Sequence, residues 1–205
     1  MKLLLRELWI DIFRMKHYLI AASLVFVVGI WMGATDERLI NFMNNSLEGM
    51  RDVVEGIQGS DHPKLWFFVF IFLNNTIKVI CFVFIGALFA VVPFFVLVVN
   101  GMTLGYVVFH PAQELSPWTI VIKGILPHGI IELPAIILAC AYGIRLGALM
   151  LKGLFYLISV RRRAVVAHEL KHYFRMTLPL MLVLVVSLFI AAVIESTFTY
   201  WLMAD

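Results

Sequence analysis

A histidine and a glutamate stand four residues apart in the stretch LPHGIIELPA, which is otherwise almost wholly apolar. Residues at this spacing share one face of an α-helix, so we expect His128 and Glu132 to project together. Imidazole and carboxylate groups are ligands for zinc and similar divalent ions. The alternative is structural, because the two side chains can also pair with each other or cap a helix end.

Other polar side chains interrupt the apolar runs at a comparable depth: Asn74, Asn75, Asn100 and Glu195. Counted at 1.5 Å per helical residue, each lies roughly 9 to 13 Å from the end of its run that the charge distribution places outside the cell. This is the layer that His128 and Glu132 enter. Ionisable groups in lipid are costly unless they are paired, face the bundle interior or are functional.

We therefore expect a shared polar cluster, in which His128, Glu132 and Glu195 bind zinc or another divalent metal. Asn74 or Asn100 is expected to support this site, and the expected binding residues are Asn74, Asn75, Asn100 and His128. Three protein ligands leave a position open for water or a substrate. The alternative for the asparagines is that they join helices through hydrogen bonds, which is a common use of membrane asparagine.

The elements that position these groups are helices in a lipid bilayer. Hydrophobic residues make up 62% of the chain and the mean hydropathy is +0.98, well above the values of soluble domains. Lipid offers the backbone no hydrogen-bond partners, so the spans must be helical. The apolar runs centre on 17–34, 65–88, 93–109, 119–151 and 177–201. The sequence predicts an all-α polytopic membrane bundle of about five transmembrane helices, forming a single domain over 1–205.

The fourth run is too long for one straight crossing. About 33 residues of helix would extend roughly 50 Å, well beyond a hydrocarbon core of about 30 Å. Pro127 removes an amide donor and Gly129 relaxes the backbone, so we predict that the fourth helix is broken near Pro127. Residues 119–126 then form a half-helix or re-entrant piece, and 128–151 form the crossing.

Charge distribution predicts the topology. The charged residues of 152–176 are mostly basic and those of 35–63 mostly acidic, so the positive-inside rule predicts a basic cytoplasmic loop and an outer acidic loop. The protein is then expected in the cell (inner) membrane, with its N-terminus in the cytoplasm and its C-terminus on the outside. Residues 1–14 mix basic and apolar side chains and predict an interfacial amphipathic helix; a cleavable signal peptide is the alternative.

A second motif, HELKH, places His168, Glu169 and His172 in the H-E-x-x-H pattern of zinc peptidases. It lies in the basic segment, and Glu195, the candidate third ligand, is predicted near the opposite membrane face. We therefore interpret this segment as a surface helix near acidic headgroups. Three basic residues within apolar runs are expected to pair or to extend to the interface: Lys78, Lys123 and Arg145.

The remaining patterns exclude several functions. The chain has no glycine-rich phosphate loop and no nucleophile elbow, which argues against ATP hydrolysis and serine hydrolase chemistry. A basic face interleaved with aromatic residues is the pattern that indicates nucleic-acid binding, and the chain has none. Cys81 and Cys140 both lie within apolar runs, so a structural disulfide is not expected.

Four blocks occur in order along the chain: FLNNTIKV (72–79), VVNGMTLGY (98–106), ILPHGIIELPAIILA (125–139) followed by GIRLG, and AAVIESTFT (191–199). Together they resemble the stage II sporulation protein M family. The resemblance implies a polytopic inner-membrane protein; founding members in spore formers act as anchoring partners of peptidoglycan hydrolases during engulfment. The shared pattern comprises Asn74, Asn75, Asn100, Gly101, His128, Gly129, Glu132 and Glu195, without assigning them chemical roles.

The resemblance favours a membrane scaffold or accessory protein of the cell envelope, with the lipid bilayer and envelope or peptidoglycan-remodelling proteins as partners. One alternative is a zinc-dependent membrane-embedded hydrolase in which Glu132 or Glu195, released from the metal, is the catalytic general base. A transport component is a further alternative, since broken helices often build substrate sites. Four-residue glycine spacing at Gly101, Gly105, Gly143 and Gly147 allows a homodimer, or close packing within one subunit.

Overall fold

The computed structural model describes residues 2–36, 53–88, 90–110, 116–156 and 160–199, together with Gly49. The regular secondary structure of these residues is helical, with no strands. Five of the described helices are long and apolar enough to cross a membrane: Lys16–Thr35, Pro63–Ile85, Val91–Phe109, Pro117–Phe155 and Arg163–Phe198. The predicted all-α membrane bundle is confirmed. Of the predicted outer acidic loop, 35–63, the segments 37–48 and 50–52 lie outside the described residues.

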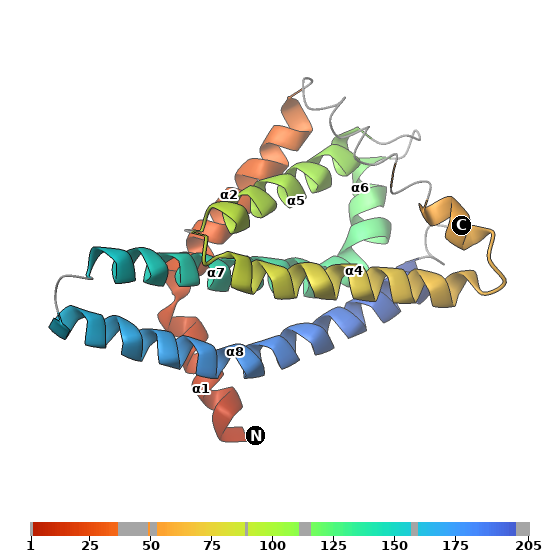
Figure 1. The fold of residues 1–205 in the computed structure, drawn as a ribbon. Coiled ribbons are helices and arrows are strands. Elements are labelled where there is room, and N and C mark those ends of the chain that lie inside the picture. Colours follow the sequence, from red (N-terminus) through yellow and green to blue (C-terminus); the bar gives the residue numbers. More distant parts are fainter. Residues whose placement is uncertain are drawn as a thin grey trace.

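The helices form two groups that meet at α7 (Leu126–Phe155). Helix α2 (Lys16–Thr35) packs along α5 (Val91–Phe109), while α4 (Pro63–Ile85) and α8 (Val160–Ile194) pack on α7 (Figure 1). Helix α1 (Lys2–Arg14) precedes α2 and lies against α8. Because α7 also contacts α2 and α5, it is the central helix of the bundle.

The middle of α7 is the core of the protein. Ala139, Cys140, Ala141 and Tyr142 are fully buried, and their mostly small side chains let neighbouring helices approach. The Tyr142 hydroxyl donates to the backbone carbonyl of Tyr173 on α8, at 3.2 Å. Large apolar side chains elsewhere are exposed on the outside of the bundle, as expected for a surface that lipid covers.

Glycines bring helix backbones into direct contact within the chain. A Cβ atom on Gly105 would stand 2.1 Å from the carbonyl oxygen of Ile30 on α2, and one on Gly143 would stand 2.2 Å from that of Phe82 on α4. Gly101 and Gly147 meet neighbouring backbone in the same way. The glycines considered for a homodimer therefore pack inside one subunit, and they give no support to a dimer.

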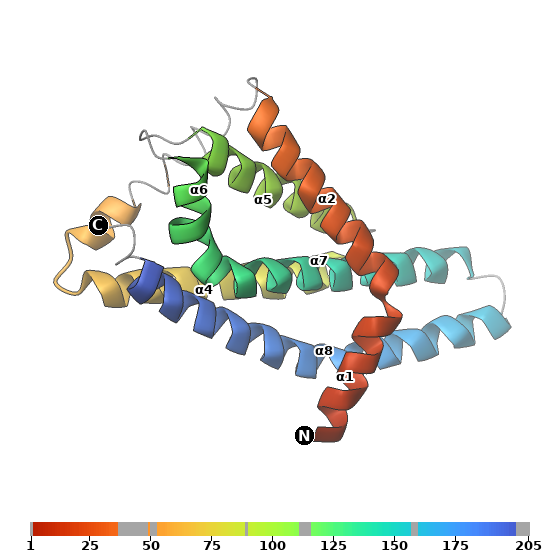
Figure 2. The same ribbon diagram turned by 180° about the vertical axis from the view of Figure 1, so that it is seen from behind.

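The predicted break in the fourth helix is present. A short helix α6 (Pro117–Thr119) leads into the π-helix η1 (Ile120–Ile125), and α7 then begins at Leu126. Figure 2 shows the α6 and η1 segment rising steeply from the start of α7. Pro127 lies in the first turn of α7, where its missing amide donor costs no intrahelical hydrogen bond.

The segment predicted as a basic loop, 152–176, is for the most part helical. Helix α7 continues to Phe155, and α8 begins at Val160 and runs to Ile194 without a break. Thirty-five helical residues extend roughly 52 Å, so α8 is longer than the hydrocarbon core requires. Lysine and arginine are good helix formers, which is why a basic segment can extend a membrane helix beyond lipid.

Candidate functional site

One group of side chains with metal-ligand spacing occurs among the described residues. The ligand atoms of His128, Glu132 and Glu195 all lie within 4.8 Å of one another, and each residue is half-buried. His128 and Glu132 come from the first two turns of α7, where the break at Pro127 starts the helix. Glu195 is the first residue of η2 (Glu195–Thr199), the π-helix that continues α8.

Two π-helical segments frame this cluster. η1 leads into the helix that carries His128 and Glu132, η2 carries Glu195, and the two segments contact each other. A π-helical turn holds more residues than an α-helical one and so changes the direction in which the following side chains project. Such segments are frequent at functional sites in other proteins.

Helix α4 supplies polar support to the cluster. The Asn75 side-chain amide donates to Oε1 of Glu132 at 2.8 Å, and the Asn74 amide donates to Oδ1 of Asn75 at 3.4 Å. The bond to Asn75 orients the Glu132 carboxylate. Asn100 differs from these two asparagines: its amide donates to the carbonyl of Val96 on its own helix, at 2.9 Å.

A lysine adds charge beside the cluster. Lys78 lies about one turn beyond Asn74 and Asn75 on α4 and interacts electrostatically with Glu132. Glu195 also interacts electrostatically with Glu132. Two carboxylates that lie close together in a low-dielectric layer repel each other, and a bound cation removes that repulsion. Of the two roles expected for Lys78, pairing and extension to the interface, this arrangement favours pairing.

The three residues are of types that bind zinc, but their ligand atoms are spread more widely than those of a formed zinc site. Ligand atoms placed tetrahedrally at 2.0–2.2 Å from zinc lie about 3.4 Å apart. Since the present separations extend up to 4.8 Å, binding requires the three side chains to draw together by up to about 1.4 Å. Rotation of half-buried side chains can supply a movement of this size.

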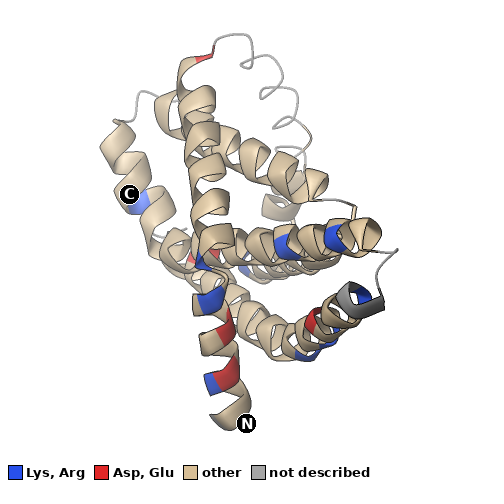
Figure 3. Cartoon of the chain, turned by 90° about the vertical axis from the view of Figure 1, so that its left-hand side faces the viewer, with Lys and Arg blue, Asp and Glu red and all other residues tan. Residues whose placement is uncertain are grey.

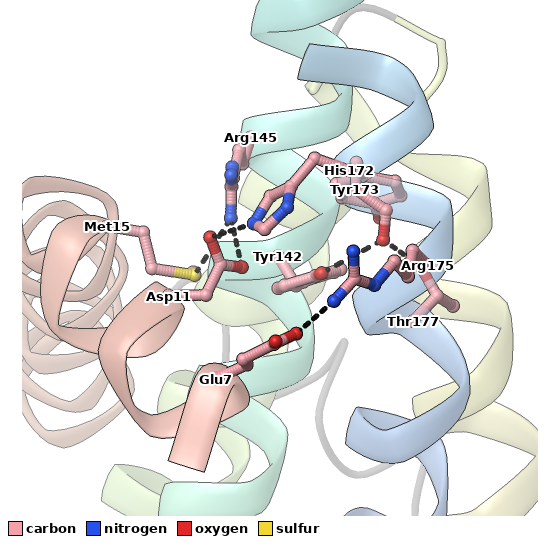
Figure 4. Close-up of polar contacts among 9 residues, drawn as sticks. All are labelled: Glu7, Asp11, Met15, Tyr142, Arg145, His172, Tyr173, Arg175 and Thr177. Atoms are coloured by element: carbon pink, nitrogen blue, oxygen red, sulfur yellow. Dashed lines mark hydrogen bonds and ion pairs between the residues drawn. The ribbon is translucent and has the colours of Figure 1, made fainter. Parts of the chain in front are cut away.

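The last residue of the HELKH motif, His172, takes part in a different cluster (Figure 4). Asp11 of α1 is buried, with its Oδ2 accepting from Nη1 of Arg145 at 2.6 Å and its Oδ1 lying 3.0 Å from Nε2 of His172. A second ion pair joins Glu7 to Arg175 nearby. These contacts tie α1 to α7 and α8. Sequence reasoning did not identify Asp11, because nothing local links it to residues so distant in the chain.

This arrangement defines a multi-pass membrane protein whose polar groups converge within its membrane helices. The chain belongs to the Stage II sporulation protein M family, which matches residues 19–200. This confirms the resemblance that the sequence blocks indicated.

The chain is also similar to two uncharacterized proteins of Methanocaldococcus jannaschii. One is 24% identical over 132 residues, which cover 64% of this chain and 72% of the relative. The other is 23% identical over 201 residues, which cover 96% of this chain and 87% of the relative. No solved structure matches the chain.

Proposed function

We propose that this protein is a membrane metalloprotein of the cell envelope that binds a divalent cation through His128, Glu132 and Glu195. One observation carries the proposal: an imidazole and two carboxylates from α7 and η2 converge within 4.8 Å in the membrane-spanning part of the chain. Carboxylates are rarely found there without a compensating partner. The donor set of one nitrogen and two carboxylates suits zinc.

In this proposal the ion has a structural role. It links the start of α7 to the end of α8, and Asn75 adds α4 through its hydrogen bond to Glu132. The three helices are thereby fixed relative to one another at the helix break. A protein built in this way can serve as a scaffold or accessory for envelope proteins, with the basic ends of α7 and α8 in the cytoplasm by the positive-inside rule.

The test is elemental analysis of the detergent-purified protein, without a metal-binding affinity tag. Wild type is expected to carry near-stoichiometric zinc, and His128→Ala is expected to lose it. His62→Ala is the matched control, because His62 is an exposed histidine that precedes α4 and lies outside the cluster. Wild-type protein without metal, or His128→Ala protein that keeps it, would refute the metal site.

A metal-dependent hydrolase is the second candidate, and the number of ligands favours it. Three protein ligands leave a coordination position where zinc can activate a water. Glu132 or Glu195, once released from the ion, is then the general base. Hydrolysis of a peptide, lipid or wall precursor that stops with a chelator and returns with zinc would support this reading over the scaffold. Co-purification of an envelope enzyme with wild-type protein that hydrolyses none of these substrates in the presence of zinc would support the scaffold.

A further inference from the structure

A cavity of about 380 Å³ lies where α1, the start of α2, α7 and α8 meet. It lies far from the metal ligands, because Arg145 on its wall is roughly 26 Å from His128 along α7. Figure 3 shows that charged residues gather on α1, beside the N label, and on the paired ends of α7 and α8. Its volume falls within the range of small-molecule sites, about 300–1,000 Å³.

Cationic side chains from different helices line this cavity. Arg14 comes from α1, and Arg145 and Lys152 come from α7. His168 and His172 of the HELKH motif add imidazoles from α8. At neutral pH the arginines and the lysine carry charge, so the lining has an excess of positive charge over its two carboxylates, Asp11 and Glu169.

The two carboxylates do not use all the hydrogen-bond donors of these cationic side chains. Both carboxylate oxygens of Asp11 form contacts, Oδ2 with Arg145 and Oδ1 with His172. Arg145 uses only Nη1 in its hydrogen bond to Asp11. A guanidinium has five N–H donors, so Arg145 retains others. Glu169 lies 3.8 Å from Lys152, and both side chains are nearly half exposed, which makes this a loose pair that an incoming anion can replace.

We propose that this cavity binds the phosphate group of an anionic ligand, supplied either by a membrane phospholipid headgroup or by a soluble phosphate. Arginine and lysine together suit a phosphate, which accepts several charge-assisted hydrogen bonds. Basic pockets between membrane helices are a recognised form of headgroup site. The proposal does not depend on the metal centre.

The experiment measures ligand binding to the full-length protein in non-ionic detergent by isothermal titration. The probes are inorganic orthophosphate, against chloride at matched ionic strength, and short-chain phosphatidic acid, against phosphatidylcholine with the same chains. Arg14→Gln and Lys152→Gln remove donors without touching the contacts of Asp11. Each is expected to weaken binding about tenfold, the size of one charge-assisted hydrogen bond. Lys152→Arg should retain the wild-type affinity for the ligand.

Lys171→Gln is the matched control, because Lys171 is exposed on the same helix as His168 but does not line the cavity. Saturable orthophosphate binding identifies a soluble phosphate as a source, and binding of phosphatidic acid alone identifies the headgroup. The proposal is overturned if neither probe binds wild type saturably, or if Lys171→Gln weakens binding as much as Lys152→Gln. Unchanged melting temperatures of the variants without ligand establish that they remain folded.

Discussion

Replacing glycine by alanine between α2 and α5 should destabilise the protein strongly. A Cβ atom on Gly33 would stand 2.0 Å from the carbonyl oxygen of Met102, and one on Gly105 would stand 2.1 Å from that of Ile30. Real Cβ contacts are not shorter than about 3 Å, so each alanine forces the two backbones apart by about 1 Å. Backbone cannot rotate away as a side chain can, so we expect a cost of about 3 kcal/mol, at the upper end of the usual range for overpacking.

The two substitutions report on one helix separation, so their effects should not add. Once α2 and α5 have moved apart for the first alanine, the second should cost less than about 1 kcal/mol more. Equilibrium unfolding in mixed detergent micelles measures the single variants and the double variant. Gly56→Ala is the control, since its Cβ would have no atom within 4 Å. Single variants as stable as Gly56→Ala, or strictly additive losses, would contradict the direct backbone contact.

Two further predictions concern the polar clusters. Asp11→Asn should lower the free energy of unfolding by about 3 kcal/mol, because it leaves Arg145 without its charged partner in a buried contact. Glu7 belongs to an exposed ion pair, so Glu7→Gln should lower the free energy of unfolding by less than about 1 kcal/mol in the same assay. Asn75→Ala should weaken zinc binding 10- to 100-fold, the usual effect of losing a residue that orients a ligand, while stoichiometry at saturating zinc stays unchanged. Competition with a zinc chelator measures that affinity, and wild-type affinity in Asn75→Ala would show that its bond to Glu132 does not tune the site.

The sequence could predict the features that depend on local spacing or on depth in the membrane. The five spans and the helix break follow from run length and from Pro127. His128 and Glu132 share a helix face by their spacing, and Glu195 could be added because its distance from the membrane surface matches theirs. The same depth argument places Asn75 in this layer, and the structure adds its hydrogen bond to Glu132.

Contacts between distant residues were beyond such reasoning. Asp11 meets Arg145 and His172 across more than a hundred residues, and no local period links them. The glycines show a related limit. Their spacing revealed that backbones approach closely, but whether the neighbour is a second subunit or another helix of the same chain depends on the packing, which places α2 against Gly105.

The separation of the two clusters makes the two proposals independently testable. His128 and Arg145 belong to the same helix, yet they lie roughly 26 Å apart, well beyond the 7–10 Å over which substitutions usually influence each other. Lys152→Gln should therefore leave the zinc content unchanged, and His128→Ala should leave phosphate binding unchanged. If instead His128→Ala abolishes both, the shared cause is a loss of the fold around α7, and neither loss then identifies a ligand. Measuring both ligands on both variants thus separates a local effect from a global one.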